Sequence, residues 1–367
     1  MILFYMVLSV VVFAFVRFLV ALFNYLTQPY LIKYPLKTPD SVSVLIPARN
    51  EESNIRNLLA DLQQQTYGGN IEVIVYNDSS TDATGQVVEE FVRVDNRFRL
   101  INGNVLPDGW LGKNNACHQL ALQAKGNYLL FLDADVRVQK DFVEQTLAYM
   151  QHKKLHLLSF FPYQVLGSFG EAITVPVMQW ILLSLLPLKL VMWSRHRSLS
   201  AANGQMMMFK AETYRKHRFH EMFRNNPVED ILIARTVKRF GYQMATLLGL
   251  PGDIRCRMYV SGNDAIEGFS KNVCEFFGGD RKVMFGYATI TTLGPFAVLF
   301  FMPYPLIFIY FFSVLMARIM IADLSKQSVL KSVILFPLQQ MSFMQMVVRW
   351  EKNRRNGTLM WKGRKIV

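Results

Sequence analysis

Short apolar runs alternate with stretches of helical apolar spacing over the first 150 residues. The apolar runs lie at 42–46, 71–76, 100–101 and 127–132, and the helical spacing covers 52–65, 84–94 and 112–125. Continuous apolar runs of this length are typical of buried strands. Strands and helices in this alternation predict an α/β fold with a doubly wound, mostly parallel sheet.

Longer apolar segments lie at both ends of the chain. Residues 1–26 carry a single charge, Arg17, and no cleavage pattern, so we expect an uncleaved transmembrane anchor. Residues 283–348 hold two further apolar blocks, predicted to form C-terminal transmembrane helices. The stretch 172–188 is apolar but broken by two prolines, which favours a helix in the membrane interface.

Composition fits a membrane protein, and the charge is concentrated in the tail. The chain of 367 residues is 51% hydrophobic and has a net charge of +13. The tail 349–367 contains seven basic residues and one acid, a pattern that indicates the cytoplasmic side and anionic lipid headgroups. No zinc-finger, helix-turn-helix or RNA-binding pattern is present, so nucleic acid is not an expected partner.

The three cysteines form no C-x-x-C pair, which favours reduced thiols in a cytosolic domain.

The same charges predict a topology. Residues 322–331 carry two lysines and one aspartate (net +1), whereas the tail carries seven basic residues and one acid (net +6). The tail then faces the cytoplasm and 322–331 is external, which gives two C-terminal crossings. Alternatively, Pro303 and Pro305 split the block 283–321 into two short crossings, which gives three and places the tail outside.

Polar groups follow three of the predicted strands. Arg49 and Glu51 follow the first strand, Asp78 follows the second, and Asp133 and Asp135 follow the fourth. Ligands of parallel α/β sheets bind beyond the carboxyl ends of strands. Two carboxylates one residue apart repel each other unless a cation lies between them. The pattern therefore predicts a nucleotide pocket with a divalent metal, manganese or magnesium, on the diphosphate. Solvated turn aspartates are the alternative for the pair alone.

The motifs P-A-R-N-E-E, N-D-S-S-T-D and D-A-D resemble the nucleotide-sugar half of glycosyltransferase family 2, over about 41–249. The resemblance implies a single GT-A domain, 41–280, with a donor half (41–150) and an acceptor half (151–280). It implies that Pro47, Arg49 and Glu51 line the base and ribose pocket and that Asp78 holds the base. It further implies that Asp133 and Asp135 contact the sugar and the metal-bound diphosphate.

Further motifs indicate which branch of this family the chain resembles. The loop G-W-L-G-K-N-N-A at 109–116 resembles that of membrane-bound enzymes that glycosylate carotenoids and hopanoid-like lipids. Lys113 would then face the donor phosphate; a helix-capping loop with an exposed lysine is the alternative. The runs 268–272 and 361–364 are weaker signals for the same branch.

The resemblance also implies a catalytic base. The family carries it in an E-D pair, which matches Glu229 and Asp230, with Asp230 as the base. A helix N-cap is the structural alternative for this aspartate. The turn containing Asn203 and Gly204 resembles the small-residue turn that lines the sugar pocket. A base at Asp230 favours a hydroxyl acceptor, because a carboxylic acid is already ionised near neutral pH.

The Q-x-x-R-W motif of processive synthases is absent, since Gln345 and Arg349-Trp350 lie one residue too far apart. We therefore expect inverting transfer of a single hexose from a nucleotide-diphosphate sugar to a carotenoid- or isoprenoid-like membrane lipid. A polyprenyl-phosphate glycosyltransferase or polysaccharide synthase is the enzymatic alternative. A catalytically silent membrane assembly subunit is the alternative of another class, against which the intact acidic residues argue.

Overall fold

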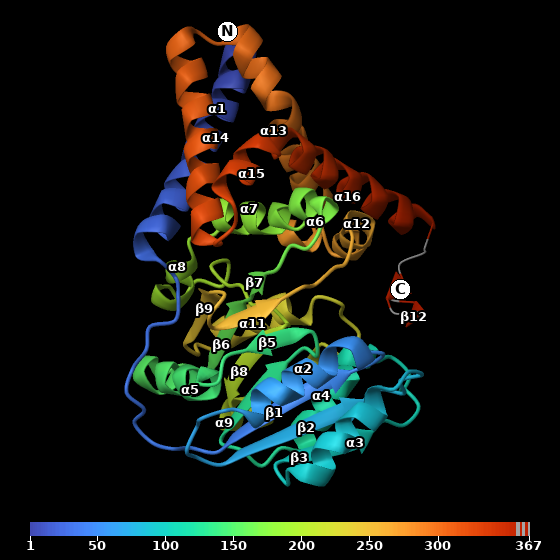
Figure 1. The fold of residues 1–367 in the computed structure, drawn as a ribbon. Coiled ribbons are helices and arrows are strands. Elements are labelled where there is room, and N and C mark those ends of the chain that lie inside the picture. Colours follow the sequence, from blue (N-terminus) through green and yellow to red (C-terminus); the bar gives the residue numbers. More distant parts are fainter. Residues whose placement is uncertain (357–359, 362–363, 366–367) are drawn as a thin grey trace. The chain divides into compact units, whose positions relative to one another are not determined.

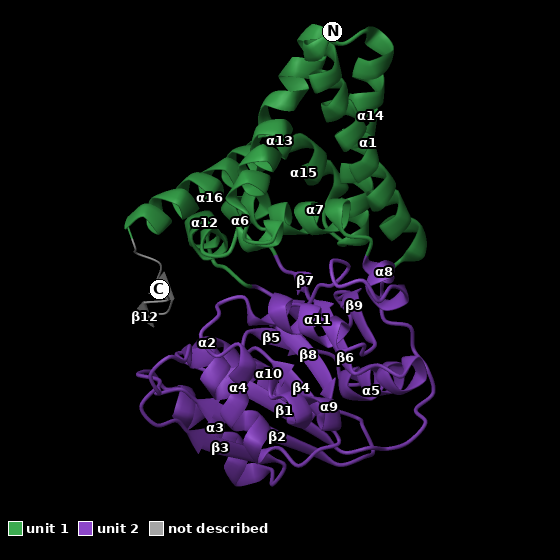
Figure 2. Ribbon diagram, turned by 180° about the vertical axis from the view of Figure 1, so that it is seen from behind, with its two compact units in different colours: residues 1–28, 166–187, 258–367 green, residues 29–165, 188–257 purple. Residues whose placement is uncertain are grey.

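The chain folds into two compact units, coloured separately in Figure 2. The computed structural model describes residues 1–356, 360–361 and 364–365. The α/β unit comprises 29–165 and 188–257, and the helical unit comprises 1–28, 166–187 and 258–367. The division differs from the domain limits expected from the sequence, because 166–187 and 258–280 pack with the apolar helices.

The α/β unit contains the alternating elements (Figure 1). Its strands are β1 Val42–Ala48, β2 Ile71–Asn77, β3 Phe98–Asn102, β4 Tyr128–Leu132, β5 Val136–Val138, β6 Leu157–Phe161, β7 Tyr163–Gln164, β8 Met206–Lys210, β9 Met244–Leu248 and β10 Ile254–Cys256. Its helices are α2 Glu52–Gln63, α3 Thr84–Val94, α4 Gly112–Gln123, α5 Phe142–Lys153, α8 Leu188–Trp193, α9 Ala211–His217, α10 Phe219–Met222 and α11 Glu229–Arg239.

The main sheet has the strand order β3-β2-β1-β4-β8-β6-β9. Its pairs are parallel except those of β8, which runs antiparallel to β4 and β6. The predicted doubly wound, mostly parallel α/β fold is confirmed. Because β1 lies between β2 and β4, the loops that follow these three strands meet at one edge. A second sheet has the strand order β5-β10-β7, and its strand β5 directly follows the D-A-D turn.

The strands and helices of the first half form where the hydrophobic pattern indicates. Strand β1 is buried along almost its whole length, and helix α3 buries Val87, Val88 and Phe91 on one face. The observed bounds of these elements differ from the predicted ones by two residues or fewer at almost every end. Strand β8 was not predicted, because its apolar run M-M-M-F pairs with a strand more than 70 residues away.

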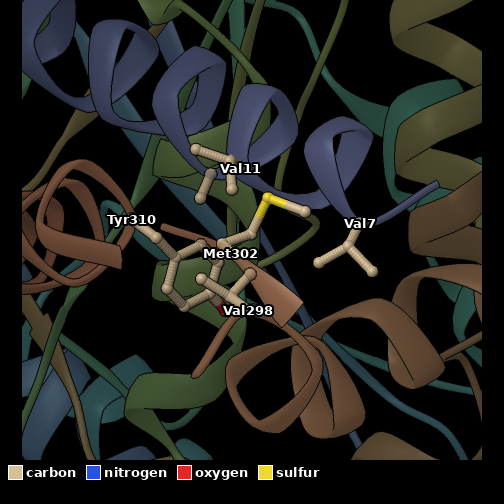
Figure 3. Packing of buried hydrophobic residues seen from close by; sticks show 6 residues of the cluster. Val7, Val11, Val298, Met302 and Tyr310 are labelled. Atoms are coloured by element: carbon tan, nitrogen blue, oxygen red, sulfur yellow. The ribbon is translucent and has the colours of Figure 1, made fainter. Parts of the chain in front are cut away.

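The helical unit is described by itself. Its elements are α1 Ile2–Thr27, α6 Phe169–Thr174, α7 Pro176–Leu185, α12 Gly262–Ser270, a 3₁₀ turn at Glu275–Phe277, α13 Arg281–Phe301, α14 Tyr304–Leu324, α15 Val329–Ile334, α16 Phe336–Asn356, β11 Met360–Trp361 and β12 Arg364–Lys365. Helices α1, α13 and α14 contact one another, and a cluster containing Val7, Val298 and Tyr310 forms part of their shared core (Figure 3).

Three helices of the described chain are long and apolar enough to cross a membrane: α1, α13 and α14. The apolar block 283–321 thus contains two helices of 21 residues each, which separate at Pro303. Helix α16, which covers most of the block 328–348, does not meet the same standard. The second C-terminal candidate span therefore lies at 304–324. The hydrophobic pattern had predicted this span at 328–348.

The segment expected as one interfacial helix at 172–188 is divided into α6, α7 and α8. Pro176 begins α7, where its missing N–H costs nothing, and Pro187 precedes α8. Ser168 caps α6, and its Oγ accepts a hydrogen bond from the backbone N–H of Glu171. A Cβ atom on Gly170 would lie 2.8 Å from the backbone nitrogen of Gly262, so α6 and α12 cross at closely approaching backbones. The weak motif 361–364 includes Lys362 and Gly363, which lie outside the described residues.

Candidate functional site

The loops after β1 and β2 are tied together by hydrogen bonds. Asn50 accepts a bond from the backbone N–H of Thr81 at 2.8 Å, and the backbone N–H of Glu51 donates to Thr84 Oγ1 at 2.8 Å. Asn50 has φ 53°, a left-handed conformation that asparagine tolerates better than most residues. Asn50 and Thr84 were not singled out from the sequence, yet they fix the relative positions of the two motifs.

Arg49 and Asp78 lie against each other across these loops. The Nη1 of Arg49 donates to the carbonyl oxygen of Asp78 at 2.7 Å and lies 3.8 Å from its Oδ2. Asp78 is buried, with 3% of its surface exposed. Pro47 lies within β1 opposite Tyr76 of β2. The structure thus brings Arg49 and Asp78 together at the carboxyl edge of the sheet.

Lys113 and Asp133 form the central ion pair. The Nζ of Lys113 lies 2.7 Å from Oδ1 and 2.8 Å from Oδ2 of Asp133, and it donates to the carbonyl oxygen of Gly204 at 3.2 Å. Burial by itself lowers the pKa of Lys113, but the negative charges of Asp133 and Glu229 outweigh it and hold the pKa above its usual value. Lys113 is therefore a permanent cation directed into the site, and the reading of it as an exposed loop lysine is wrong.

Asp230 does not cap its helix. The N-cap of α11 is Val228, and Oδ2 of Asp230 instead accepts the backbone N–H of Gly204 at 2.9 Å. Its Oδ1 accepts the N–H of Ile231 at 2.7 Å. Burial raises the pKa of Asp230, while these two N–H groups and the charge of Lys113 oppose the rise.

Glu229 lies beside this carboxylate and is buried. Burial raises its pKa to about 8, with a further contribution from Asp230 and an opposing one from Lys113. Burial thus favours the protonated form of Glu229 more than it does for an ordinary glutamate.

Gly204 is where the two halves of the α/β unit meet. A Cβ atom at this position would lie 3.2 Å from Lys113 Nζ, 3.4 Å from Glu229 Oε1 and 3.6 Å from Asp230 Oδ2. The loop before β8 thus carries one residue, Gly204, whose carbonyl oxygen accepts a hydrogen bond from the lysine and whose own N–H donates to the aspartate. Asn203 does not point its amide into this cluster; its Oδ1 accepts the N–H of Gln205 at 2.9 Å and shapes the turn.

Asp135 is a buried carboxylate whose charge Lys113 compensates only in part. Burial, with the charges of Asp133 and Glu51, raises its pKa to about 7. Its Oδ1 is buried and has no hydrogen-bond partner in the described part of the chain. The other carboxylate of the pair, Asp133, is partly neutralised by Lys113.

These features suit a divalent cation at Asp135. Cations of this class bind carboxylate oxygens together with substrate phosphates. No cluster of three or more histidine, cysteine or acidic side chains with metal-binding geometry occurs among the described residues. The protein would thus supply one or two ligands and the diphosphate would supply others. Cys256 on β10 was not singled out as a site residue from the sequence. It lies beside Asp135, and its Sγ accepts a hydrogen bond from Nε2 of Gln205.

A cavity of about 150 Å³ in the α/β unit contains none of these residues. It lies beside the bidentate pair of Arg137 and Asp61, whose shortest N–O distance is 2.6 Å. We locate the site by its converging charged groups, because volume alone carries no chemistry.

The α/β unit has the arrangement of a GT-A domain, and the helical unit contains helices long and apolar enough to cross a membrane. Residues 43–218, slightly less than half of the chain, match the sequence profile described as "Glycosyl transferase family 2", so this part of the chain is similar to that family. The fold is similar to that of a mannosyltransferase from Pyrobaculum calidifontis in complex with GDP-Man and Mn2+. That likeness has a TM-score of 0.52 at 16% identity and covers 95% of this chain and 99% of the other.

Curated relatives support the same class. The chain is 28% identical over 252 residues to 4,4'-diaponeurosporenoate glycosyltransferase of Staphylococcus haemolyticus, covering 66% of this chain and 65% of the relative. The match to the enzyme of the same name from Staphylococcus aureus is 28% over 249 residues, covering 66% and 64%. The chain thus spans slightly less than two thirds of the length of these relatives.

Proposed function

We propose that the protein transfers a single hexose, with inversion, from a nucleotide-diphosphate sugar to a carotenoid- or isoprenoid-like membrane lipid. The observation that carries the proposal is the convergence of Lys113, Asp133, Glu229 and Asp230 around Gly204. This cluster holds one fixed cation, Lys113, and two carboxyl groups of raised pKa, those of Glu229 and Asp230, around the same small space. Such a pair suits a displacement in which an anion leaves and a proton is taken up.

In this proposal the donor lies along the carboxyl edge of β1, β2 and β4. Asp78 and Arg49 hold the base, Glu51 and Pro47 line the ribose pocket, and Asp133 contacts the sugar. Lys113 faces the diphosphate, where a fixed ammonium stabilises the negative charge that develops as the bond to the sugar breaks. Manganese or magnesium, when bound at Asp135 and Asp133, supplies further neutralisation of that charge.

Asp230 acts on the acceptor. The acceptor oxygen attacks the anomeric carbon while the bond from that carbon to the diphosphate oxygen breaks. A hydroxyl acceptor passes its proton to Asp230, whereas a carboxylate acceptor attacks in its ionised form and has no proton to transfer. The backbone N–H of Gly204 fixes the orientation of Asp230 through a bond of 2.9 Å. One base and one direct displacement give inversion, and no separate nucleophile is needed.

The acceptor proposal rests on the membrane helices and the relatives. The relatives' name, diaponeurosporenoate glycosyltransferase, denotes a carotenoid acid as their acceptor. The three candidate spans suit an acceptor that stays in the bilayer. With α1, α13 and α14 as crossings, the α/β unit and the tail lie on one side, and the basic tail favours the cytoplasmic side.

The test uses the purified full-length protein with a panel of nucleotide sugars and a membrane lipid extract. Release of nucleoside diphosphate together with a lipid carrying one hexose, detected by mass spectrometry, is the expected result. A polymeric product would indicate a synthase. Donor binding without any turnover on any acceptor would support an assembly subunit instead.

A further inference from the structure

Two arginines of the helical unit are buried without an acidic partner. Arg17 on α1 is 6% exposed and Arg318 on α14 is 5% exposed. Neither forms an ion pair with a carboxylate within the residues that the structure describes. Because an unpaired buried charge is costly, an arginine inside a membrane helix usually marks a functional site.

One tryptophan brings the two charges together. The guanidinium carbon of Arg17 lies 4.3 Å from the ring centroid of Trp180, and that of Arg318 lies 4.4 Å from it. Arg318 also lies 4.0 Å from the ring of Phe336. Such contacts are favourable but weaker than the cost of removing the charge from water. Trp180 therefore gathers positive charge without neutralising it.

The hydrogen bonds of both guanidinium groups are incomplete. Nε and Nη2 of Arg17 donate to Ser184 Oγ at 3.0 and 2.8 Å. Nη1 of Arg318 donates to Gln339 Oε1 at 2.7 Å and to the carbonyl oxygen of Ser332 at 3.3 Å. Nε of Arg318 is buried and has no partner among the described residues. A guanidinium group has five N–H donors, so donors remain for an outside acceptor.

Small recesses adjoin Trp180. The one that includes Arg17 has a volume of about 20 Å³ and is otherwise mainly apolar. The one that includes Arg318 has a volume of about 10 Å³ and also includes Gln179 and Ser325. Each has room for an atom or small group the size of water. They suit the oxygens of a headgroup whose hydrocarbon chain lies outside, along the helices.

Both arginines lie toward the helix ends that face the same side of the membrane in the proposed topology. Arg17 is ten residues before the end of α1 (27 minus 17) and Arg318 is six before the end of α14 (324 minus 318). At about 1.5 Å per residue these positions are roughly 15 and 9 Å from the ends. With a hydrocarbon core about 30 Å thick, both positions fall in the half of the bilayer that adjoins those helix ends.

We propose that Arg17 and Arg318 bind the oxyanion headgroup of a membrane lipid. The ligand is either a long-chain carboxylate, which would be the acceptor, or the phosphate of an anionic phospholipid. Identification of the ligand as acceptor rests on the proposed function, whereas the site itself does not. A bound oxyanion would accept the remaining N–H donors and neutralise the gathered charge.

The experiment measures the thermal midpoint of the full-length protein in nonionic detergent with four additives. These are oleate, methyl oleate, phosphatidylglycerol and phosphatidylcholine. The wild type is expected to gain stability with oleate or phosphatidylglycerol and not with their neutral counterparts. A larger gain with oleate assigns the acceptor as the ligand, and a larger gain with phosphatidylglycerol assigns the phospholipid.

The double variant Arg17→Gln/Arg318→Gln should bind the anionic additive roughly tenfold or more weakly, because it loses charge-assisted hydrogen bonds. Its midpoint without additive should not fall, because two uncompensated charges are removed. The control Arg349→Gln/Lys352→Gln removes the same charge from exposed positions on α16 and should respond like the wild type.

Equal stabilisation by the anionic and neutral additives would overturn the proposal, and so would an unchanged anion response in the glutamine variant. Should that variant fail to fold, the same measurement is made on Arg17→Lys/Arg318→Lys. This variant keeps both positive charges, so the proposal requires that anionic additives still stabilise it more than neutral ones. Hydrolysis of the donor sugar is measured alongside. Loss of that activity with intact anion binding would count against the proposed function alone.

Discussion

At the scale of single residues, the site depends on how four charged groups share one small space. Lys113 is paired with Asp133, and the two acids at the start of α11 each have a raised pKa. A carboxylate of raised pKa is a stronger base than an ordinary one, provided that it is ionised at the working pH. Burial raises the pKa of Asp230, and two backbone N–H groups favour its ionised form and limit the rise.

Substitution of Asp230 tests the base directly. Asp230→Asn keeps the size of the side chain and removes its ability to take a proton. With a hydroxyl acceptor, turnover should fall roughly 100-fold or more, the usual scale of general-base loss. The measurement is the rate of lipid glycoside formation, with Glu89→Gln on the exposed face of α3 as the control. Near wild-type turnover would indicate an acceptor that is already ionised, or a base elsewhere.

The pH dependence of kcat/KM should have two limbs. Activity should rise as Asp230 loses its proton, at a pH above the ordinary carboxyl value because burial raises its pKa. It should fall again near pH 8, where Glu229 ionises and adds a second negative charge beside Lys113. Glu229→Gln, which cannot ionise, should keep the acidic limb and lose the alkaline one. An alkaline limb that persists in this variant would assign it to another group.

Asp135 provides the metal test. Its buried Oδ1 has no partner in the described chain, so Asp135→Ala should abolish transfer while leaving the melting temperature close to that of the wild type. Removal of a carboxylate that repels its neighbours costs the fold little. Chelation should have the same effect, with recovery on addition of manganese or magnesium. Full activity after exhaustive chelation would rule out a metal at this position.

At the scale of elements, helix crossings in the helical unit depend on glycine. Gly170→Ala would place a methyl group 2.8 Å from the backbone of Gly262, where neither partner can move aside as a side chain could. Overpacking of this kind costs about 1–3 kcal/mol, so the thermal midpoint should drop. Gly286→Ala on α13, where a Cβ meets nothing within 4 Å, is the matched control and should leave the midpoint unchanged or raise it slightly, because alanine favours a helix. Equal midpoints for the two variants would show that α6 and α12 separate at little cost.

The local pattern predicted most of the elements, but not every partner. The strands and helices of the first half follow from the apolar runs, and the motif residues follow from their positions at strand ends. Gly204 as the meeting point of Lys113 and Asp230 could not be predicted, because β8 enters the sheet between strands distant in sequence. The role of Asn203 shows the same limit. Its side chain, predicted to line the sugar pocket, accepts a hydrogen bond from a backbone N–H group of its own turn instead.

At the scale of the whole molecule, the hydrophobic content of the C-terminal third was read correctly as membrane helices, but their division was not. The alternative in which Pro303 and Pro305 divide the block 283–321 agrees with α13 and α14, two helices of 21 residues each, whereas the crossing predicted at 328–348 does not occur among the candidate spans of the described chain. Helix α16 contains three glutamines and, from Arg349 on, five charged residues, so its hydropathy is below that of a span. The turn at Met302 and Pro303 thus replaces 322–331 as the segment expected on the far side.

Topology mapping gives the last prediction. With α1, α13 and α14 as the crossings, a reporter inserted at the turn between Met302 and Pro303 should lie opposite to one fused after Val367. An enzyme reporter that works only outside the cell should be active at the turn and silent at the tail, because the tail is strongly basic. A reporter within 322–331 should match the tail, which distinguishes this arrangement from one in which α16 crosses. Activity after Val367 in the external compartment would require a further crossing and would remove the cytoplasmic placement of the tail.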